Sequence, residues 1–297
     1  MYKRQPLPAP TINPIAVDDV LNAAEAASTT LSGSNEAGAL VTLTIGTRDV
    51  TPIVNADVWQ YRLTPTDVAE LTQGANTLTV TQTDASGNTS PASTRLLTVD
   101  TLAPTAPAAT DITADNTINA AEKAAGATLT GSNEAGASVR LNIAGKEVQA
   151  SVSGNAWHYA LSADDFVALG EGSVQAGITQ TDAAGNTSAT TIKTFNIDTI
   201  APQGLVISDI VTAGNGTLTG GVEAGSTVTL DLGDGISRLT TLSTDGKSWT
   251  YTLSAAESNA FQSAATTVNV RATDAAGNTA SISQTLSLIH ISEPTRP

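Results

Sequence analysis

The sequence predicts an all-β protein built from three tandem antiparallel β-sandwiches. Short alternating strands are separated by turn residues about every 8–12 positions, a pattern typical of such sandwiches. An acidic turn recurs as TDASGNTS at Thr83–Ser90, TDAAGNTS at Thr181–Ser188 and TDAAGNTA at Thr273–Ala280. One tryptophan accompanies each copy, at Trp59, Trp157 and Trp249. Because these landmarks lie roughly 100 residues apart, each copy has the length of a domain and exceeds a solenoid repeat.

We therefore expect domains over residues 6–102, 103–200 and 201–285. The two ends, residues 1–5 and 286–297, match nothing in the copies. Codons for Tyr-Lys-Arg-Gln near the start, read on the opposite strand, encode the Leu-Ser-Leu-Ile that opens the last segment. Both ends resemble translated sequencing adapter, so we expect them to be artefacts outside the folded domains, and we expect no functional role for His290. On this interpretation the chain is cut from a longer protein.

The composition excludes several classes of function. The chain has no cysteine, so disulfides and thiolate metal sites are excluded. A net charge of −15 with only 13 Lys and Arg argues against nucleic acid as a partner. No apolar run is long enough to span a membrane, so we expect no membrane insertion. His158 is the remaining histidine and occurs in one copy only, so we expect no enzyme.

The strands follow in order along the second copy. We expect them at residues 127–132, 138–143, 147–152, 156–161, 173–180 and 190–197. Trp157, Tyr159 and Leu161 alternate onto one face, which predicts a core position for the tryptophans rather than a sugar-stacking surface. His158 then points outward.

Short helices are expected between the strands at residues 156–161 and 173–180, the fifth and sixth of a seven-stranded count, and at the equivalent place in the other copies. Each copy has Ser or Thr followed three residues later by an acid, a helix-start signature: Thr64 and Asp67, Ser162 and Asp165, Ser254 and Glu257. Pro65 stands at the first helical position, where proline is tolerated. The segments LNAAEAAS and INAAEKAAG form brief helical turns or belong to the connection between the first two strands.

These motifs resemble a known family. LTGSNEAGASVRLNI, NAWHYAL, TDAAGNTS and the linkers VDTLAP and IDTIAP resemble the bacterial Ig-like repeats of large biofilm-associated and RTX-type surface adhesins, over residues 8–285. The resemblance implies three tandem Ig-like antiparallel β-sandwiches in an elongated array, with calcium held by aspartates near domain junctions. The third copy departs from the pattern, since its SDIVTAGNG lacks the NAAE segment.

Strand counting places the acidic turns at the junctions. In a seven-stranded up-and-down count, the NEAG and DAAGN turns of one copy both face the linker that arrives from the copy before. The metal candidates are Asp100, Glu134 and Asp182 at the first junction and Asp198, Glu223 and Asp274 at the second. Asp84 and Glu36 face a domain outside this sequence. Weaker candidates are Asp111, Asp115, Asp18 and Asp19.

Converging carboxylates repel one another unless a cation lies between them. Calcium suits them, because it takes about 6–8 oxygen ligands from carboxylates, carbonyls and water. The alternative is that Asp in each turn only satisfies its own backbone, which needs no metal. Both interpretations are compatible, and Pro104 and Pro202 stiffen the linkers in either case.

The expected function is structural: a stalk segment of a secreted adhesin, extracellular or on the bacterial cell surface, whose junctions are rigidified by calcium. Its partners are neighbouring repeats and a host or biofilm-matrix ligand. Two alternatives remain open. The repeats are a module that binds a glycan or host protein, or they are accessory domains of a secreted enzyme.

Overall fold

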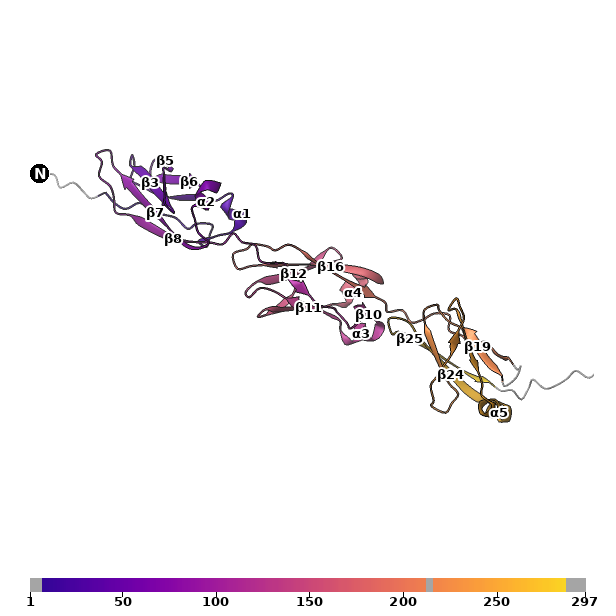
Figure 1. Cartoon of the computed structure of the whole chain (residues 1–297). Helices are drawn as coiled ribbons and strands as arrows, with labels where there is room; N and C mark the ends of the chain where they lie inside the picture. Colours follow the sequence, from indigo (N-terminus) through magenta and orange to yellow (C-terminus); the bar gives the residue numbers. More distant parts are fainter. Residues whose placement is uncertain (1–6, 212–215, 287–297) are drawn as a thin grey trace, which may run out of the picture. The chain divides into compact units, whose positions relative to one another are not determined.

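The structure is a computed structural model that describes residues 7–211 and 216–286. Strands joined by turns dominate it, with short helices between some of them (Figure 1). The described residues form two compact units. One contains the residues up to Ala109 with Gly131–His158 and Gly177–Ile192, and the other contains Thr110–Thr130, Tyr159–Ala176 and the residues from Lys193 onward. We assign each element to the sequence copy that contains it, and the three-domain division stays a prediction.

The adapter-like segments 1–5 and 286–297 lie outside the described residues, with one exception. Leu286 is described, ends the last strand and packs against the core of the third copy. Within SDIVTAGNG, residues 212–215 also lie outside the described part of the chain.

The first copy forms two sheets, with strand orders β1-β8-β7-β3-β4 and β2-β6-β5. Its elements are β1 (Val20–Leu21), α1 (Ala23–Ala26), β2 (Thr30–Ser34), β3 (Leu40–Ile45), β4 (Arg48–Val50), β5 (Ile53–Asn55), β6 (Val58–Arg62), α2 (Pro65–Ala69), β7 (Gly74–Thr83) and β8 (Ser93–Val99).

The second copy repeats this plan, with strand orders β10-β17-β16-β12-β13 and β14-β15-β11-β9. Its elements are β9 (Ala108–Ala109), β10 (Thr117–Ile118), α3 (Ala120–Ala125), β11 (Thr128–Ser132), β12 (Ser138–Ile143), β13 (Lys146–Gln149), β14 (Ser151–Ser153), β15 (Ala156–Ala160), α4 (Ala163–Leu169), β16 (Gly172–Thr181) and β17 (Thr191–Ile197).

The third copy has strand orders β18-β19-β23-β22 and β21-β20-β24-β25. Its elements are β18 (Asp209–Val211), β19 (Thr217–Gly221), β20 (Thr227–Asp231), β21 (Arg238–Leu239), β22 (Thr241–Leu242), β23 (Ser248–Thr252), α5 (Ala255–Ser263), β24 (Thr266–Thr273) and β25 (Thr279–Leu286). The all-β fold is therefore as the sequence predicts.

The sheets are not purely antiparallel, which corrects the up-and-down count. β1 pairs in parallel with β8, and β10 pairs in parallel with β17. The incoming segment first runs along one sheet, where the Thr11 and Asn13 N–H groups donate to β2, and then crosses to the other sheet as β1. Two-residue strands are too short to show any periodicity, so the sequence pattern gave no sign of this switch.

A second correction concerns residues 147–152, expected as one strand. The structure divides them between β13 and β14, which belong to different sheets. Ala150, between the two strands, is buried. The other five strands expected in the second copy occur within one or two residues of their predicted bounds.

The helix-start signatures are confirmed as capping boxes. The hydroxyl oxygens of Thr64, Ser162 and Ser254 accept from the backbone N–H three residues on, and the acid there accepts from the cap N–H in return. Pro65 is the first residue of α2. The NAAE segments form α1 and α3, capped by Asn22 and Asn119 in the same way.

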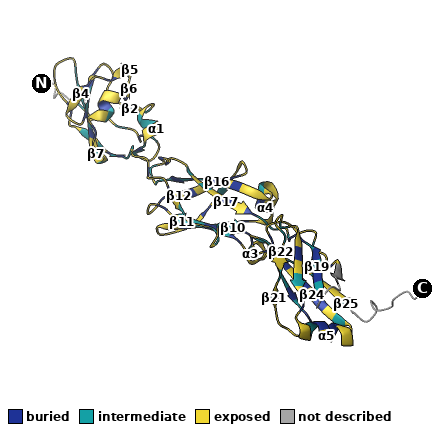
Figure 2. Ribbon diagram, turned by 45° about the vertical axis from the view of Figure 1, so that its right-hand side comes forward, coloured by how far each residue is buried: buried dark blue, intermediate teal, exposed yellow. Residues whose placement is uncertain are grey.

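The strands bury alternate residues (Figure 2), as β12 does with its strict exposed–buried alternation. All three tryptophans are buried, as predicted: Trp59, Trp157 and Trp249. His158 is exposed, also as predicted. Burying these large side chains against aliphatic neighbours provides the main stabilisation of each copy.

Each buried indole also has a polar role. The Nε1–H groups donate to backbone carbonyls of the incoming segments, at 2.9 Å to Thr11, 3.0 Å to Ala108 and 3.2 Å to Val206. A glycine opposite each tryptophan leaves room for that carbonyl, because a Cβ there would lie 1.8–1.9 Å from the oxygen: Gly33, Gly131 and Gly220.

Candidate functional site

The candidate site begins with the recurring acidic turn. In the second copy the Asp182 carboxylate accepts from the Asn186 backbone N–H at 2.8 Å and from the Asn186 side-chain amide at 3.0 Å. Gly185 adopts φ +96°, the left-handed conformation that glycine tolerates. Partial burial opposes ionisation, but the bonds from Asn186 and from neighbouring N–H groups outweigh it and lower the pKa of Asp182. The internal hydrogen bonds of the turn therefore favour the ionised form of Asp182.

This turn contacts the linker that arrives from the first copy. The Asn186 amide nitrogen donates to the Asp100 backbone carbonyl at 2.9 Å as well as to Asp182. Asp100 itself is held by its N–H, which donates to the Leu21 carbonyl at 3.0 Å. Asn186 is buried, with 6% of its surface exposed. One amide thus joins two of the three acidic residues expected at the first junction.

The same turn completes the cap of α1. The Asn22 side-chain oxygen accepts from the Glu25 N–H, while its amide nitrogen donates to the Ala184 carbonyl at 3.0 Å. The Ala23 N–H, which a helix leaves without an internal partner, donates to the Asn186 side-chain oxygen at 3.0 Å. We call Asn22, Ala23, Asp100, Ala184 and Asn186 the first latch; all five lie within one compact unit.

A second latch repeats these contacts inside the other compact unit. The Asn119 amide donates to the Ala276 carbonyl at 2.9 Å, and the Ala120 N–H donates to the Asn278 oxygen at 2.8 Å. The Asn278 amide donates to the Asp198 carbonyl at 2.8 Å and to the Asp274 carboxylate at 3.0 Å. The second latch is Asn119, Ala120, Asp198, Ala276 and Asn278.

The parallel strand pairs place the latch residues side by side. Leu21 is paired with Val99, so the next residues, Asn22 and Asp100, lie together where the two strands end. Ile118 is paired with Ile197 in the same register, which brings Asn119 and Asp198 together. The asparagines were not among the predicted site residues, although their recurrence in NAAE and DAAGN was the available signal.

The glutamates of the NEAG turns lie elsewhere. The Glu223 carboxylate accepts from the Gln203 N–H of the linker at 2.7 Å. Glu134 lies beside linker residues Thr105–Ala108, and its N–H donates to Gln180 at 2.9 Å. The Glu36 N–H donates to Gln82 in the same manner. These turns therefore contact the linkers several residues beyond Asp100 and Asp198.

The four weaker candidates are engaged within their own copies. Asp19 forms an ion pair with Arg95, and Asp111 forms one with Lys193. Asp18 accepts from the Val20 N–H, and Asp115 accepts from Thr113 and Thr117. These bonds hold the segment that crosses from one sheet to the other just before β1 in the first copy and β10 in the second.

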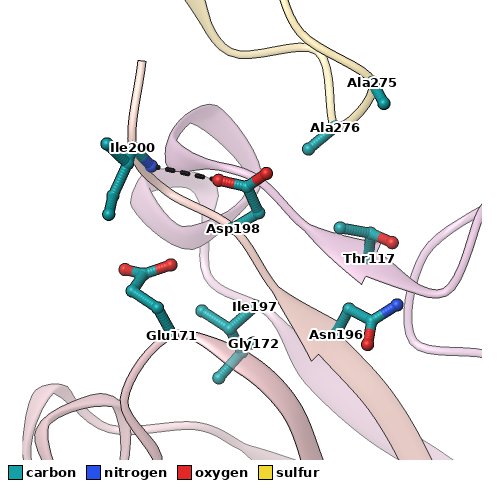
Figure 3. Close-up of a pocket in the computed structure, with 9 residues that line it drawn as sticks. All are labelled: Thr117, Glu171, Gly172, Asn196, Ile197, Asp198, Ile200, Ala275 and Ala276. Atoms are coloured by element: carbon teal, nitrogen blue, oxygen red, sulfur yellow. Dashed lines mark hydrogen bonds between the residues drawn. The ribbon is translucent and has the colours of Figure 1, made fainter. Parts of the chain in front are cut away.

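A cavity of about 390 Å³ adjoins the second latch (Figure 3). Glu171 and Asp198 both line it, with Ala275 and Ala276 from the turn of the third copy. The Glu171 carboxylate accepts from the Thr199 N–H at 2.9 Å. In the first copy Gln73 makes the matching bond to the Thr101 N–H at 3.1 Å. The second latch therefore has a carboxylate beside it, that of Glu171, where the first latch has the Gln73 amide.

The carboxylate and carbonyl oxygens at the two latches are of the type that calcium binds, but they are fewer than a full calcium shell requires. Carboxylate and carbonyl oxygens are the ligands calcium takes, about 6–8 at a time. Among residues 7–211 and 216–286, no group of three or more Asp, Glu or His side chains is arranged to hold a metal. The Asn186 amide nitrogen already donates hydrogen bonds to two of these oxygens, the Asp100 carbonyl and the Asp182 carboxylate. A calcium ion here would need water to complete its shell.

The turn of the first copy makes the same internal hydrogen bonds in a different environment. Asp84 accepts from the Asn88 N–H at 2.9 Å and from the Asn88 side chain at 2.6 Å. Asn88 is exposed, whereas Asn186 and Asn278 are buried. Among the described residues, the bonds of the Asn88 side chain stay within its own turn.

Residues 16–101 match the family model described as a bacterial Ig-like domain. The first copy is a bacterial Ig-like domain. The resemblance expected from the sequence motifs is thereby confirmed, and the first latch lies where this Ig-like domain ends. The search of curated proteins found no match. No helix in the described part of the chain has the length and apolar character of a membrane span.

Solved structures of adhesins are similar to the chain. A 1.5-MDa bacterial ice-binding adhesin shares 26% identity, with 96% of this chain and 98% of that chain covered and a TM-score of 0.46. A Ca2+-stabilized adhesin of an ice-binding Antarctic bacterium shares 28% identity, with 95% and 73% covered and a TM-score of 0.49. An Ig-like domain of the M. primoryensis ice-binding adhesin shares 27% identity, with 33% and 100% covered and a TM-score of 0.24.

Proposed function

We propose that this chain is a structural segment of a secreted bacterial surface adhesin, in which tandem Ig-like repeats form a stalk. The recurrence of the latch carries the proposal: three equivalent hydrogen bonds of 2.8–3.0 Å form both the first and the second latch. A ligand-binding site needs to occur only once, whereas a support repeats its contacts at every junction. The role is mechanical rather than catalytic.

The buried tryptophans favour this function over a glycan-binding module. Exposed aromatic rings are the side chains that stack on sugars, and Trp59, Trp157 and Trp249 are at most 1% exposed. Each indole N–H is also occupied by a backbone carbonyl of its own copy. These rings support the core and the incoming segment.

The proposal includes calcium at the junctions, bound weakly and partly through water. Asp100 and Asp182 would hold it at the first latch, and Asp198, Asp274 and Glu171 at the second. Extracellular calcium modules commonly have dissociation constants of about 10⁻⁴–10⁻³ M. At about 10 mM calcium, binding of this strength stabilises the folded chain by about 1–3 kcal/mol. The calcium ion would add stability to junctions that hydrogen bonds already hold together.

Spin labels test the stalk function directly, because the chain has no cysteine of its own. Thr47→Cys in the first copy and Ser153→Cys in the second carry the labels at exposed positions. A narrow distance distribution in calcium-free buffer is the expected result. A broad distribution in both calcium-free and calcium-containing buffer would mean that the copies move independently, which contradicts a stiff stalk.

Calcium is tested separately by thermal unfolding with 0 to about 10 mM calcium. Asp100→Asn is the sharpest variant, because the latch uses the Asp100 backbone carbonyl, and within the described part of the chain its carboxylate accepts only from the Leu102 N–H. We expect the unmodified chain to gain stability with calcium and the Asp100→Asn and Asp198→Asn variants to gain less. An unchanged melting temperature in the unmodified chain would remove calcium from the proposal and leave the latches standing.

A further inference from the structure

The outer face of one sheet in the third copy has a polar hollow of about 340 Å³ over β20, β24 and β25. The strand register arranges its outward side chains in two rows that cross these three strands. The first row is Thr229, Arg271 and Ser281, and the second row is Asp231, Asn269 and Ser283. The rows lie about 7 Å apart, because they are separated by two residues of extended strand.

The guanidinium of Arg271 is exposed in this hollow and is available to a ligand. Within residues 7–211 and 216–286, the Arg271 side chain makes no hydrogen bond or ion pair. The second copy has a smaller hollow of about 190 Å³ on the corresponding sheet, and its Arg140 forms an ion pair with Glu147 at 3.5 Å. The first copy has a threonine pair on the corresponding strands, Thr42 and Thr81. An unpaired arginine is therefore a feature of the third copy alone among these three positions.

The groups around Arg271 are hydrogen-bonding groups rather than apolar surface. The Ser283 hydroxyl donates to the Asn269 side-chain oxygen at 2.7 Å, which leaves the Asn269 amide nitrogen as a donor. One oxygen of Asp231 accepts from the N–H groups of the three loop residues Gly233, Asp234 and Gly235, at 2.8, 3.1 and 3.0 Å. The first row therefore offers a positive charge between two hydroxyl groups, and the second row offers an amide and a carboxylate.

We propose that this hollow is a binding site for a saccharide that carries a carboxylate, of the uronic acid class. The planar guanidinium of Arg271 matches a carboxylate, to which it can donate two parallel hydrogen bonds. Hydroxyl groups of the sugar ring would accept from Asn269 and donate to Asp231 in the second row. A simple carboxylic acid would leave that row without a partner, which favours a saccharide.

This binding mode differs from aromatic stacking on neutral sugars. It depends on charge and hydrogen bonds, so the burial of the three tryptophans does not oppose it. The net charge of −15 disfavours an anionic ligand, but charges more than about 8 Å away are largely screened at about 0.15 M salt. We therefore expect weak binding, with a dissociation constant on the order of 1 mM. The inference adds a ligand to the proposed stalk segment and does not depend on the stalk function.

A nuclear magnetic resonance titration of the full chain with trigalacturonate tests the inference, in calcium-free buffer at about 0.15 M salt. Without calcium, no ion can bridge the ligand to acidic side chains. We expect chemical shift changes on β20, β24 and β25, and an affinity about tenfold lower in Arg271→Gln, because the charged hydrogen bonds are lost. Arg140→Gln is the matched control, since it removes the same charge from a hollow whose arginine is already paired, and it should bind as the unmodified chain does.

Two further ligands separate the charge from the sugar. The fully methyl-esterified trisaccharide keeps the sugar rings and loses the charge, and acetate keeps a carboxylate and loses the rings. We expect both to bind more weakly than trigalacturonate. Equal affinity for the ester would show that Arg271 does not recognise a carboxylate, and equal affinity for acetate would show that the sugar is not recognised. Either result would overturn the inference, as would a chain that does not bind trigalacturonate or an Arg271→Gln variant that binds it unchanged.

Discussion

The side-chain amide of Asn186 donates to the backbone carbonyl of Asp100 at 2.9 Å, across 86 positions of sequence. The acceptor is a backbone atom, so the bond depends on where Asp100 lies rather than on its charge. The parallel pairing of β1 and β8 fixes that position, because Leu21 and Val99 are paired at the strand ends. The latch is therefore a consequence of strand register.

Replacing Asn186 with Ala should loosen the first latch. The variant loses the bonds to Asp100 and Ala23 together, a cost of about 1–3 kcal/mol at the junction. The distance distribution between labels at Thr47→Cys and Ser153→Cys should broaden, while the melting of each copy changes little. Asn142→Ala should leave the distribution narrow, and an equally narrow distribution in Asn186→Ala would show that the latch does not hold the junction.

The Glu171→Gln variant should remove the Glu171 charge beside the second latch while keeping its hydrogen bond to the linker N–H. Gln73 shows that a glutamine makes the same bond to the linker N–H, so the fold should lose less than about 0.5 kcal/mol. The calcium-dependent rise in melting temperature should shrink, because one carboxylate leaves the cavity beside Asp198. An undiminished response, measured by thermal unfolding with and without calcium, would exclude Glu171 as a ligand.

Acidification should destabilise the first copy through Asp67. Burial raises the pKa of this carboxyl, but bonds from Thr64 and Tyr61 and the Arg48 charge outweigh burial and lower it below 3.8. A depressed folded-state pKa stabilises the fold above the unfolded value, and the stability is lost as pH falls through the folded value. Unfolding free energies measured by denaturant should therefore fall below about pH 4.

Asp67→Asn should remove that pH dependence. The uncharged side chain costs about 2 kcal/mol at neutral pH, since the bonds to Arg48 and Tyr61 no longer reach an ionised acceptor. Because Arg48 is 44% exposed, solvent offsets part of the loss of the ion pair. If the variant keeps the acid transition of the unmodified chain, another group is responsible for it.

Gly33→Ala should destabilise the first copy by about 3 kcal/mol. The new Cβ would lie 1.8 Å from the Thr11 carbonyl and 2.6 Å from the Trp59 Nε1, so the incoming segment or the indole has to move. Gly177→Ala is the matched control, because its Cβ meets only side chains, the nearest at 3.4 Å. Thermal unfolding and tryptophan fluorescence measure both, and equal melting temperatures would show that the close approach at Gly33 is unimportant.

The local sequence determined the repeated copies, the buried tryptophans, the capped helices and the internal form of each acidic turn. These features depend on spacings of two to four residues, as in the capping box of Ser162 and Asp165. Strand counting also predicts that the acidic turns lie near the linkers. It did not identify the asparagines that make the contacts.

Only the tertiary structure decided how the turns meet their neighbours. A two-residue strand such as β1 has no period to detect, yet its parallel pairing with β8 places Asn22 beside Asp100. The bond from Asn22 to Ala184 then spans 162 positions, and the acceptor is a backbone carbonyl that every residue possesses. The recurring asparagines mark such contacts in the sequence without showing which atoms they meet, because strand register rather than residue type selects the partner.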